Sequence, residues 1–81
     1  MLIENEKLYD ALENALRAFY YPDEYVFVHA IYEPDEDGGP HEGMYHAAAD
    51  LRVLGRTFHV WFVVNDDDSI LIGDTERWYM G

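Results

Sequence analysis

The chain has 81 residues, of which 17 are acidic and five are Lys or Arg, so its formal net charge at pH 7 is −12, and it contains no cysteine. The missing cysteines exclude disulfides and thiolate metal sites, while the negative charge repels nucleic acid and anionic membranes and attracts basic protein surfaces. We therefore expect a protein-binding role without direct contact to nucleic acid or membrane.

Length and the first residues predict the organisation of the chain. A sequence of this size is sufficient for a single small domain, 1–81, with one core. The first residues include Glu4 and Glu6 and lack the basic and apolar pattern of a signal peptide, and no apolar run reaches membrane-spanning length. We expect a soluble protein of the cytoplasm.

Residues 4–20 are predicted to form an amphipathic helix. Apolar residues recur at three- and four-residue spacing and fall on one stripe: Leu8, Leu12, Ala15, Leu16 and Phe19. Asn5 or Glu4 is expected to cap the start, and Pro22 disfavours helical geometry just before it, so the helix should end near Tyr20. The acidic outer face is either a partner surface or simply a solvated one.

Residues 25–32, YVFVHAIY, are rich in β-branched and aromatic side chains and predict a strand. Strict alternation gives two largely apolar faces, Val26, Val28, Ala30 and Tyr32 on one and Tyr25, Phe27, His29 and Ile31 on the other. Such a strand either is central in its sheet or has its second face covered by something outside this chain.

A loop, 33–43, leads into residues 44–64, which are predicted to be two antiparallel strands that reverse at Leu54-Gly55. A two-residue turn there pairs apolar side chains: Leu51 with Phe58, Ala49 with Val60, Ala47 with Phe62 and Tyr45 with Val64. These eight residues form one apolar face. The opposite face is mixed and pairs Asp50 with His59; it also carries His46, Ala48, Thr57, Trp61 and Val63.

The C-terminal part predicts a turn at 65–69, NDDDS, and a short strand at 69–73 with Ile70 and Ile72 on one face. The remaining residues, which include Trp78 and Tyr79, are expected to fold back onto the sheet or the helix. The predicted fold is α+β, with an N-terminal helix packed on one face of an antiparallel three- to four-stranded β-meander. One helix cannot cover both faces, so we expect a half-apolar outer face.

Two patterns suggest a metal site or catalysis, but neither has the spacing of such sites. His46 and His59 share a face with Asp50, yet no His-x-His or Glu-x-x-His pattern is present. The segment from Asn65 partly matches a calcium loop but has Ile70 where Gly is needed. We expect no enzyme, no catalytic residue, no metal and no cofactor.

The acids favour a binding protein whose carboxylates stand in for nucleic-acid phosphates. Two acidic loops and one ring are the predicted contact residues: Asp35, Glu36, Asp37, Glu42, Asp66, Asp67, Asp68 and Trp61. Their charges would speed encounter with Lys and Arg in the groove of a nucleic-acid-binding protein, and the ring would anchor the contact. The hypothesis is similar in kind to small acidic inhibitors that phages or mobile elements direct against nucleases and defence complexes.

Two alternatives remain open. The first is a self-associating accessory or structural protein of a high-salt organism, in which the acid excess and the single lysine, Lys7, suit the salt and the outer sheet face forms a homodimer. The second is an enzyme or ligand binder with His29 as a base and a pocket lined by Tyr20, Tyr21, Tyr25 and Tyr32.

Overall fold

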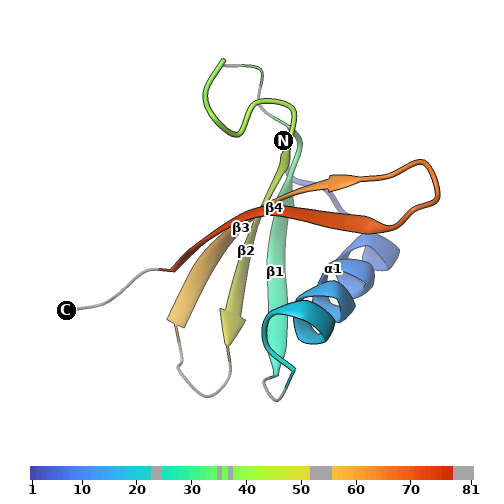
Figure 1. Cartoon of the computed structure of the whole chain (residues 1–81), viewed down its shortest axis with the longest axis vertical. Coiled ribbons are helices and arrows are strands. Elements are labelled where there is room, and N and C mark those ends of the chain that lie inside the picture. Colours follow the sequence, from blue (N-terminus) through green and yellow to red (C-terminus); the bar gives the residue numbers. More distant parts are fainter. Residues whose placement is uncertain (23–24, 35, 37, 52–55, 78–81) are drawn as a thin grey trace.

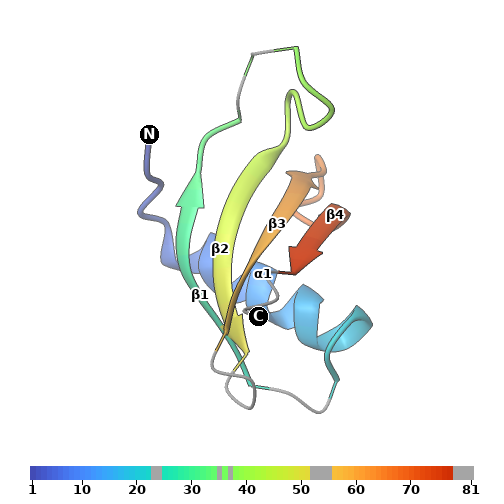
Figure 2. The same cartoon turned by 90° about the vertical axis from the view of Figure 1, so that its left-hand side faces the viewer.

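The computed structural model describes residues 1–22, 25–34, 36, 38–51 and 56–77. It has one helix and four strands, which are α1 (Glu6–Phe19), β1 (Val26–Tyr32), β2 (Tyr45–Leu51), β3 (Arg56–Val64) and β4 (Ile70–Arg77). The strands form one antiparallel sheet in the order β1-β2-β3-β4, and α1 lies on one face of it, against β1 and within reach of β4 (Figure 1 and Figure 2). The predicted α+β meander is confirmed.

The helix is held at both ends as its sequence predicts, within one or two residues. The Asn5 side chain accepts a hydrogen bond from the Lys7 amide at 3.1 Å, which satisfies one of the free amides of the first turn. At the other end the Tyr20 amide still donates to the Leu16 carbonyl. Leu12 and Leu16 are fully buried, so the apolar stripe faces the sheet.

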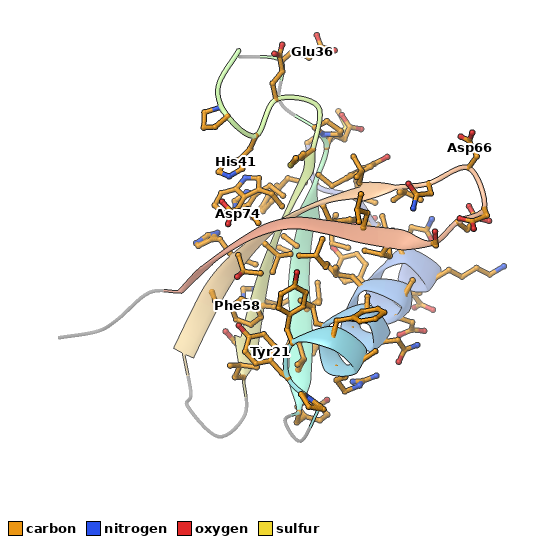
Figure 3. The ribbon with its side chains drawn as sticks, in the orientation of Figure 1. Tyr21, Glu36, His41, Phe58, Asp66 and Asp74 are labelled. Carbon is orange, nitrogen blue, oxygen red and sulfur yellow. The ribbon has the colours of Figure 1, made fainter. Side chains whose placement is uncertain are left out.

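The core lies between α1 and the inner face of the sheet. Its buried members come from the helix, its C-terminal extension and the first three strands: Leu12, Leu16, Tyr21, Val26, Val28, Ile31, Ala47, Ala49, Leu51, Phe58, Val60 and Phe62. The ring of Tyr21 packs on that of Phe58, with centroids 5.3 Å apart (Figure 3). Small alanines of β2 lie beside larger side chains of β3 in this core, with Ala49 opposite Phe58 and Ala47 opposite Val60.

β1 is an edge strand, and not the central strand that was one of its two predicted positions. Its pairing with β2 is interrupted between Val28, opposite Ala49, and Ala30, opposite Ala48. His29 is therefore the extra residue of a β-bulge, and the bulge shifts the alternation of side chains by one position.

The bulge overturns the predicted faces of the second half of β1. Ile31 is fully buried, whereas Tyr32 is 40% exposed, the reverse of strict alternation. Tyr32 consequently lies exposed on the outer face. The other predicted alternative, in which something outside this chain covers the second face, stays a prediction.

The free edge of β1 is covered by groups from α1 and from the N-terminal segment. Glu13 Oε2 accepts a hydrogen bond from the Val28 amide at 2.9 Å, and the Tyr9 hydroxyl oxygen accepts one from the Ile31 amide at 3.1 Å. The Ile3 amide donates to the Ile31 carbonyl at 2.7 Å. Because these amides and carbonyls are occupied, this edge is closed to pairing with a strand of another molecule.

β2 and β3 form the predicted hairpin, but the predicted register is wrong by two residues. Leu51 lies opposite Arg56 and Ala49 opposite Phe58, whereas a two-residue turn would have paired Leu51 with Phe58. Residues 52–55 separate the last pair, and the predicted turn at Leu54-Gly55 falls within them, outside the described residues. A shift of two keeps every side chain on its own face, so the apolar inner face is as predicted although its pairs are not.

β4 is longer than predicted. Residues 74–77, expected to belong to a folded-back tail, continue the strand and pair with β3. Ile70 and Ile72 pack against the core, as predicted for one face of this strand. Trp78 and Tyr79 lie outside the described residues.

The hydroxyl of Tyr9 bridges two parts of the fold, since it also donates to the Ile3 carbonyl at 2.7 Å. Tyr9→Phe leaves that carbonyl and the Ile31 amide without this partner, so we expect the free energy of unfolding to fall by about 1–2 kcal/mol. For a domain of this size the thermal midpoint should drop by roughly 5–10 °C, measured by circular dichroism. Tyr20→Phe, at a half-exposed ring, is the matched control and should change neither quantity; equal effects of both substitutions would contradict the bridge.

Candidate functional site

The predicted acidic contact residues lie in two separate loops. Glu36 and Glu42 are exposed in the β1–β2 connection, and Asp66 is exposed in the β3–β4 turn. In a meander both connections leave the same end of the sheet, but Figure 3 shows Glu36 and Asp66 at different corners of the molecule. Asp35 and Asp37 lie outside the described residues, so the two loops are not shown to form one track.

The β3–β4 turn is built by its own polar side chains. Asp67 Oδ1 accepts hydrogen bonds from the Ser69 hydroxyl and amide, and these bonds lower the pKa of the Asp67 carboxyl. Asp68 takes a left-handed conformation with φ of 68°, which Asp tolerates better than most residues. Strands flank this turn on both sides, so its partial match to a calcium loop lacks the helices of that motif.

A groove of about 610 Å³ separates the first half of α1 from β1 and the N-terminal segment. Four carboxylates line it, those of Glu4, Glu6, Asp10 and Glu13. Apolar and aromatic side chains supply the rest of the lining, chiefly Leu2, Tyr9, Tyr25, Phe27 and Val28. The groove therefore combines a concentrated negative charge with rings that are about half exposed, Tyr25 and Phe27.

The acids of the groove form a stripe along α1. Glu6, Asp10 and Glu13 are spaced by four and three residues, which places them on one side of a helix. Like charges at this spacing destabilise a helix by a few tenths of a kcal/mol per pair, roughly 0.2–0.5. Among the described residues the ion pairs involve only histidine, so no Lys or Arg there neutralises this stripe.

The outer face of the sheet carries a layer of imidazoles and rings. Tyr32 stacks on His46 with centroids 5.7 Å apart, and His46 stacks on Trp61 at 5.0 Å. His46 Nε2 and His59 Nδ1 are 2.7 Å apart, so one nitrogen donates a hydrogen bond to the other. This diagonal contact follows from the corrected register, in which His46 faces Trp61 and Ala48 faces His59.

The predicted pairing of Asp50 with His59 is wrong. Asp50 faces Thr57, whose hydroxyl donates to Asp50 Oδ1 at 2.7 Å, and the nearby imidazole is that of His29 in the bulge of β1, with Nε2 3.5 Å from the same oxygen. His29 is thus beside a carboxylate on the outer face. Of the four tyrosines proposed to form a pocket with it, Tyr25 lines the groove and Tyr21 is buried in the core, so they do not gather around it.

Trp61, the predicted ring anchor, is partly covered. The imidazole of His41 stacks on it with centroids 3.9 Å apart and planes inclined by 9°. His41 Nε2 donates to Asp74 Oδ2 at 3.0 Å, and Figure 3 shows these two residues side by side. This hydrogen bond lowers the pKa of Asp74 below its ordinary value. The β1–β2 loop is consequently anchored at His41, a contact that the sequence did not predict.

The described part of the chain holds no group of three or more His, Asp or Glu side chains placed to bind a metal ion. None of its helices is long and apolar enough to cross a bilayer. Comparison with models of protein families, with curated proteins and with solved structures found no significant match.

The groove itself was only half predicted. The sequence predicts an acidic helix face as one possible partner surface. The side of α1 that faces β1 depends on how the helix packs on the sheet, and the sequence pattern does not predict this. The spacing of Glu6, Asp10 and Glu13, read together with the exposed alternation of Tyr25 and Phe27, was the available signal.

His41→Ala removes the hydrogen bond to Asp74, so we expect the pKa of the Asp74 carboxyl to rise toward its ordinary value. A lowered pKa contributes stability that is present above the unfolded-state pKa and is lost as the pH falls through the folded-state pKa. The part of the stability difference that comes from this hydrogen bond should therefore be present at neutral pH and lost in acid, whereas the part that comes from the stacking on Trp61 should remain. A carbon-detected NMR titration of the wild type and the variant measures the pKa of the Asp74 carboxyl. The pKa of the Asp67 carboxyl is the internal control, because its hydrogen bonds come from Ser69 and not from His41. An unchanged pKa of Asp74 would contradict the assignment.

Proposed function

We propose that this chain is a non-enzymatic acidic module that binds a basic segment of another protein in the α1–β1 groove. The observation that carries the proposal is the groove itself, where four carboxylates and two half-exposed rings line one depression. Lys and Arg side chains pair with carboxylates and also stack on aromatic faces, so one basic segment satisfies both kinds of lining group.

The charge of the groove supports a cationic ligand over other ligands. The repulsion along the helix stripe is relieved only when positive charge arrives, which gives a basic segment a gain that a neutral one lacks. The net charge of −12 adds a long-range field that speeds the approach of a basic partner. The same negative field repels nucleic acid, whose phosphates are also negatively charged.

The contact surface extends from the groove toward the β1–β2 loop. Leu2 lines one end of the groove, and its backbone pairs with Tyr32, the last residue of β1. The acids of the following loop, among them Glu36 and Glu42, continue from this end. A partner that normally holds the phosphates of a nucleic acid has basic groups spread over such a length. In this proposal the chain occupies the nucleic-acid groove of that partner and thereby inhibits a nuclease or a defence complex.

Two variants with equal charge test where the partner binds. Glu4→Gln/Glu6→Gln/Asp10→Asn neutralises the groove, and Glu36→Gln/Asp66→Asn/Asp68→Asn neutralises the same number of exposed loop acids. Glu13 is left intact because it holds the Val28 amide. We expect the groove variant to bind about ten-fold more weakly and the loop variant to lose less. Equal losses would show that only net charge matters.

The experiment begins with proteins of the native host that the wild-type chain retains at low salt and releases at high salt. Each retained protein is then bound to its own labelled nucleic acid, and the chain is added. Displacement of the nucleic acid, weaker for the groove variant, supports the proposal. A retained protein that holds the chain and the nucleic acid together, or retention that salt does not weaken, contradicts it.

The high-salt alternative is favoured by one observation, the uncovered outer face. In that function the acids serve the folded state only when screened, so the free energy of unfolding should rise steeply with salt and the fold should be lost in dilute buffer. Urea unfolding followed by circular dichroism at several salt concentrations measures this. A chain that unfolds cooperatively and is stable in dilute buffer would exclude the alternative.

A further inference from the structure

The hydrogen bonds at the bottom of the α1–β1 groove determine how a segment can be recognised there. Glu13 Oε2 accepts a hydrogen bond from the Val28 amide at 2.9 Å, and the Tyr9 hydroxyl accepts one from the Ile31 amide at 3.1 Å. Because these edge amides of β1 are occupied, a bound segment cannot add to the sheet as a further strand. Recognition in the groove therefore depends on the side chains of the segment.

The two walls of the groove present different groups at nearly the same interval. On α1, Glu6 and Asp10 are four residues apart, which is a rise of about 6 Å along the helix. On the other wall, Tyr25 and Phe27 are two residues apart where β1 begins, a separation of about 6.7 Å in an extended chain. Their rings are 54% and 48% exposed. The groove therefore offers carboxylates on one side and ring surface on the other, each of them twice.

We propose that the groove selects an extended segment with two arginines at alternate positions, Arg-x-Arg, an inference that rests on the proposed function and names its ligand. A guanidinium group is planar, so it stacks on an aromatic ring by its face and donates hydrogen bonds to carboxylates from its edge. One arginine thus uses both walls. A lysine ammonium is compact and strongly hydrated, so it pairs with the carboxylates and gains less from the rings. Alternate side chains of an extended segment lie on one side of it, about 6.7 Å apart, which matches the interval of the groove.

The charge of the groove accommodates two such arginines. Glu4, Glu6, Asp10 and Glu13 line it, and the hydrogen bond of Glu13 to the Val28 amide uses one carboxylate oxygen and a neutral donor. Two guanidinium groups leave the lining with an excess of negative charge, so the second arginine is still attracted after the first has bound. Among the described residues the ion pairs involve only histidine, so the segment displaces no lysine or arginine of this chain from an ion pair there.

Short peptides of equal charge test the selection. Each is acetylated and amidated, is otherwise built of Gly and Ser, and carries Arg-Ser-Arg, Lys-Ser-Lys, Arg-Arg or Arg-Ser-Ser-Arg. Binding to the full chain at low salt is measured from the amide NMR shifts of α1 and β1. We expect Arg-Ser-Arg to bind about ten-fold more tightly than Lys-Ser-Lys, because two ring contacts are lost with lysine. The two arginine peptides with other spacings should also bind more weakly than Arg-Ser-Arg.

Ring variants of the chain separate stacking from charge. Tyr25→Leu and Phe27→Leu keep every carboxylate, so each should weaken Arg-Ser-Arg by about three-fold or more and change Lys-Ser-Lys less. Tyr20→Leu is the matched control, because the Tyr20 ring is 46% exposed at the end of α1 and does not line the groove. It should leave the binding of both peptides unchanged. Circular dichroism verifies that each variant is folded.

The outcomes distinguish this inference from the function on which it rests. Equal binding of Arg-Ser-Arg and Lys-Ser-Lys, lost in Glu4→Gln/Glu6→Gln/Asp10→Asn, would overturn the selection of arginine and leave a groove that binds any basic segment. Equal binding of the three arginine peptides would overturn the alternate spacing. An arginine preference that survives both ring variants would contradict the role of the rings. Binding of no peptide, or binding that the neutralised groove retains, would overturn the inference and the proposed function together.

Discussion

A single helix has to cover a four-stranded sheet, and it can cover only one face of it. The inner face packs against the apolar stripe of α1 and forms the core, whereas the outer face is left in contact with solvent. It carries imidazoles stacked on rings and placed beside carboxylates, groups that tolerate water on one side and apolar contact on the other.

How far the fold could be predicted depended on periodicity. Alternation in β2 and β3 assigned Ala47, Ala49, Phe58 and Phe62 to the correct face, because burial of one face imposes a period of two. A period of two cannot distinguish registers that differ by two residues. The connection between β2 and β3 is longer than the two-residue turn predicted from Gly55, and this sets the register. The bulge at His29 was invisible for a related reason. Both faces of β1 are apolar, so an extra residue leaves no gap in the pattern.

The candidate site shows what composition can and cannot supply. Acid content predicted a basic partner class and pointed to the loops, since runs such as Asp66 to Asp68 stand out in one dimension. The groove joins two segments, Glu6 to Glu13 on α1 and Tyr25 to Val28 on β1, that are ordinary when read separately. Their meeting depends on the angle at which the helix crosses the edge strand, a property of core packing. The anchoring of His41 on Trp61 depends likewise on where a long loop returns.

The hydrogen bonds that cover the free edge of β1 are not equally well supported along the strand, and this determines where the molecule should begin to unfold and aggregate. Glu13 and Tyr9 belong to α1, which is fixed in the core, and their side chains accept hydrogen bonds from the amides of Val28 and Ile31. Beyond them the edge is covered by the N-terminal segment, where the Glu33 amide donates to the Met1 carbonyl with little buried surface behind it. Fraying begins in such weakly packed segments. Each brief opening there presents bare strand backbone beside the ring of Tyr32, so aggregation under stress should start at this corner and not at the helix.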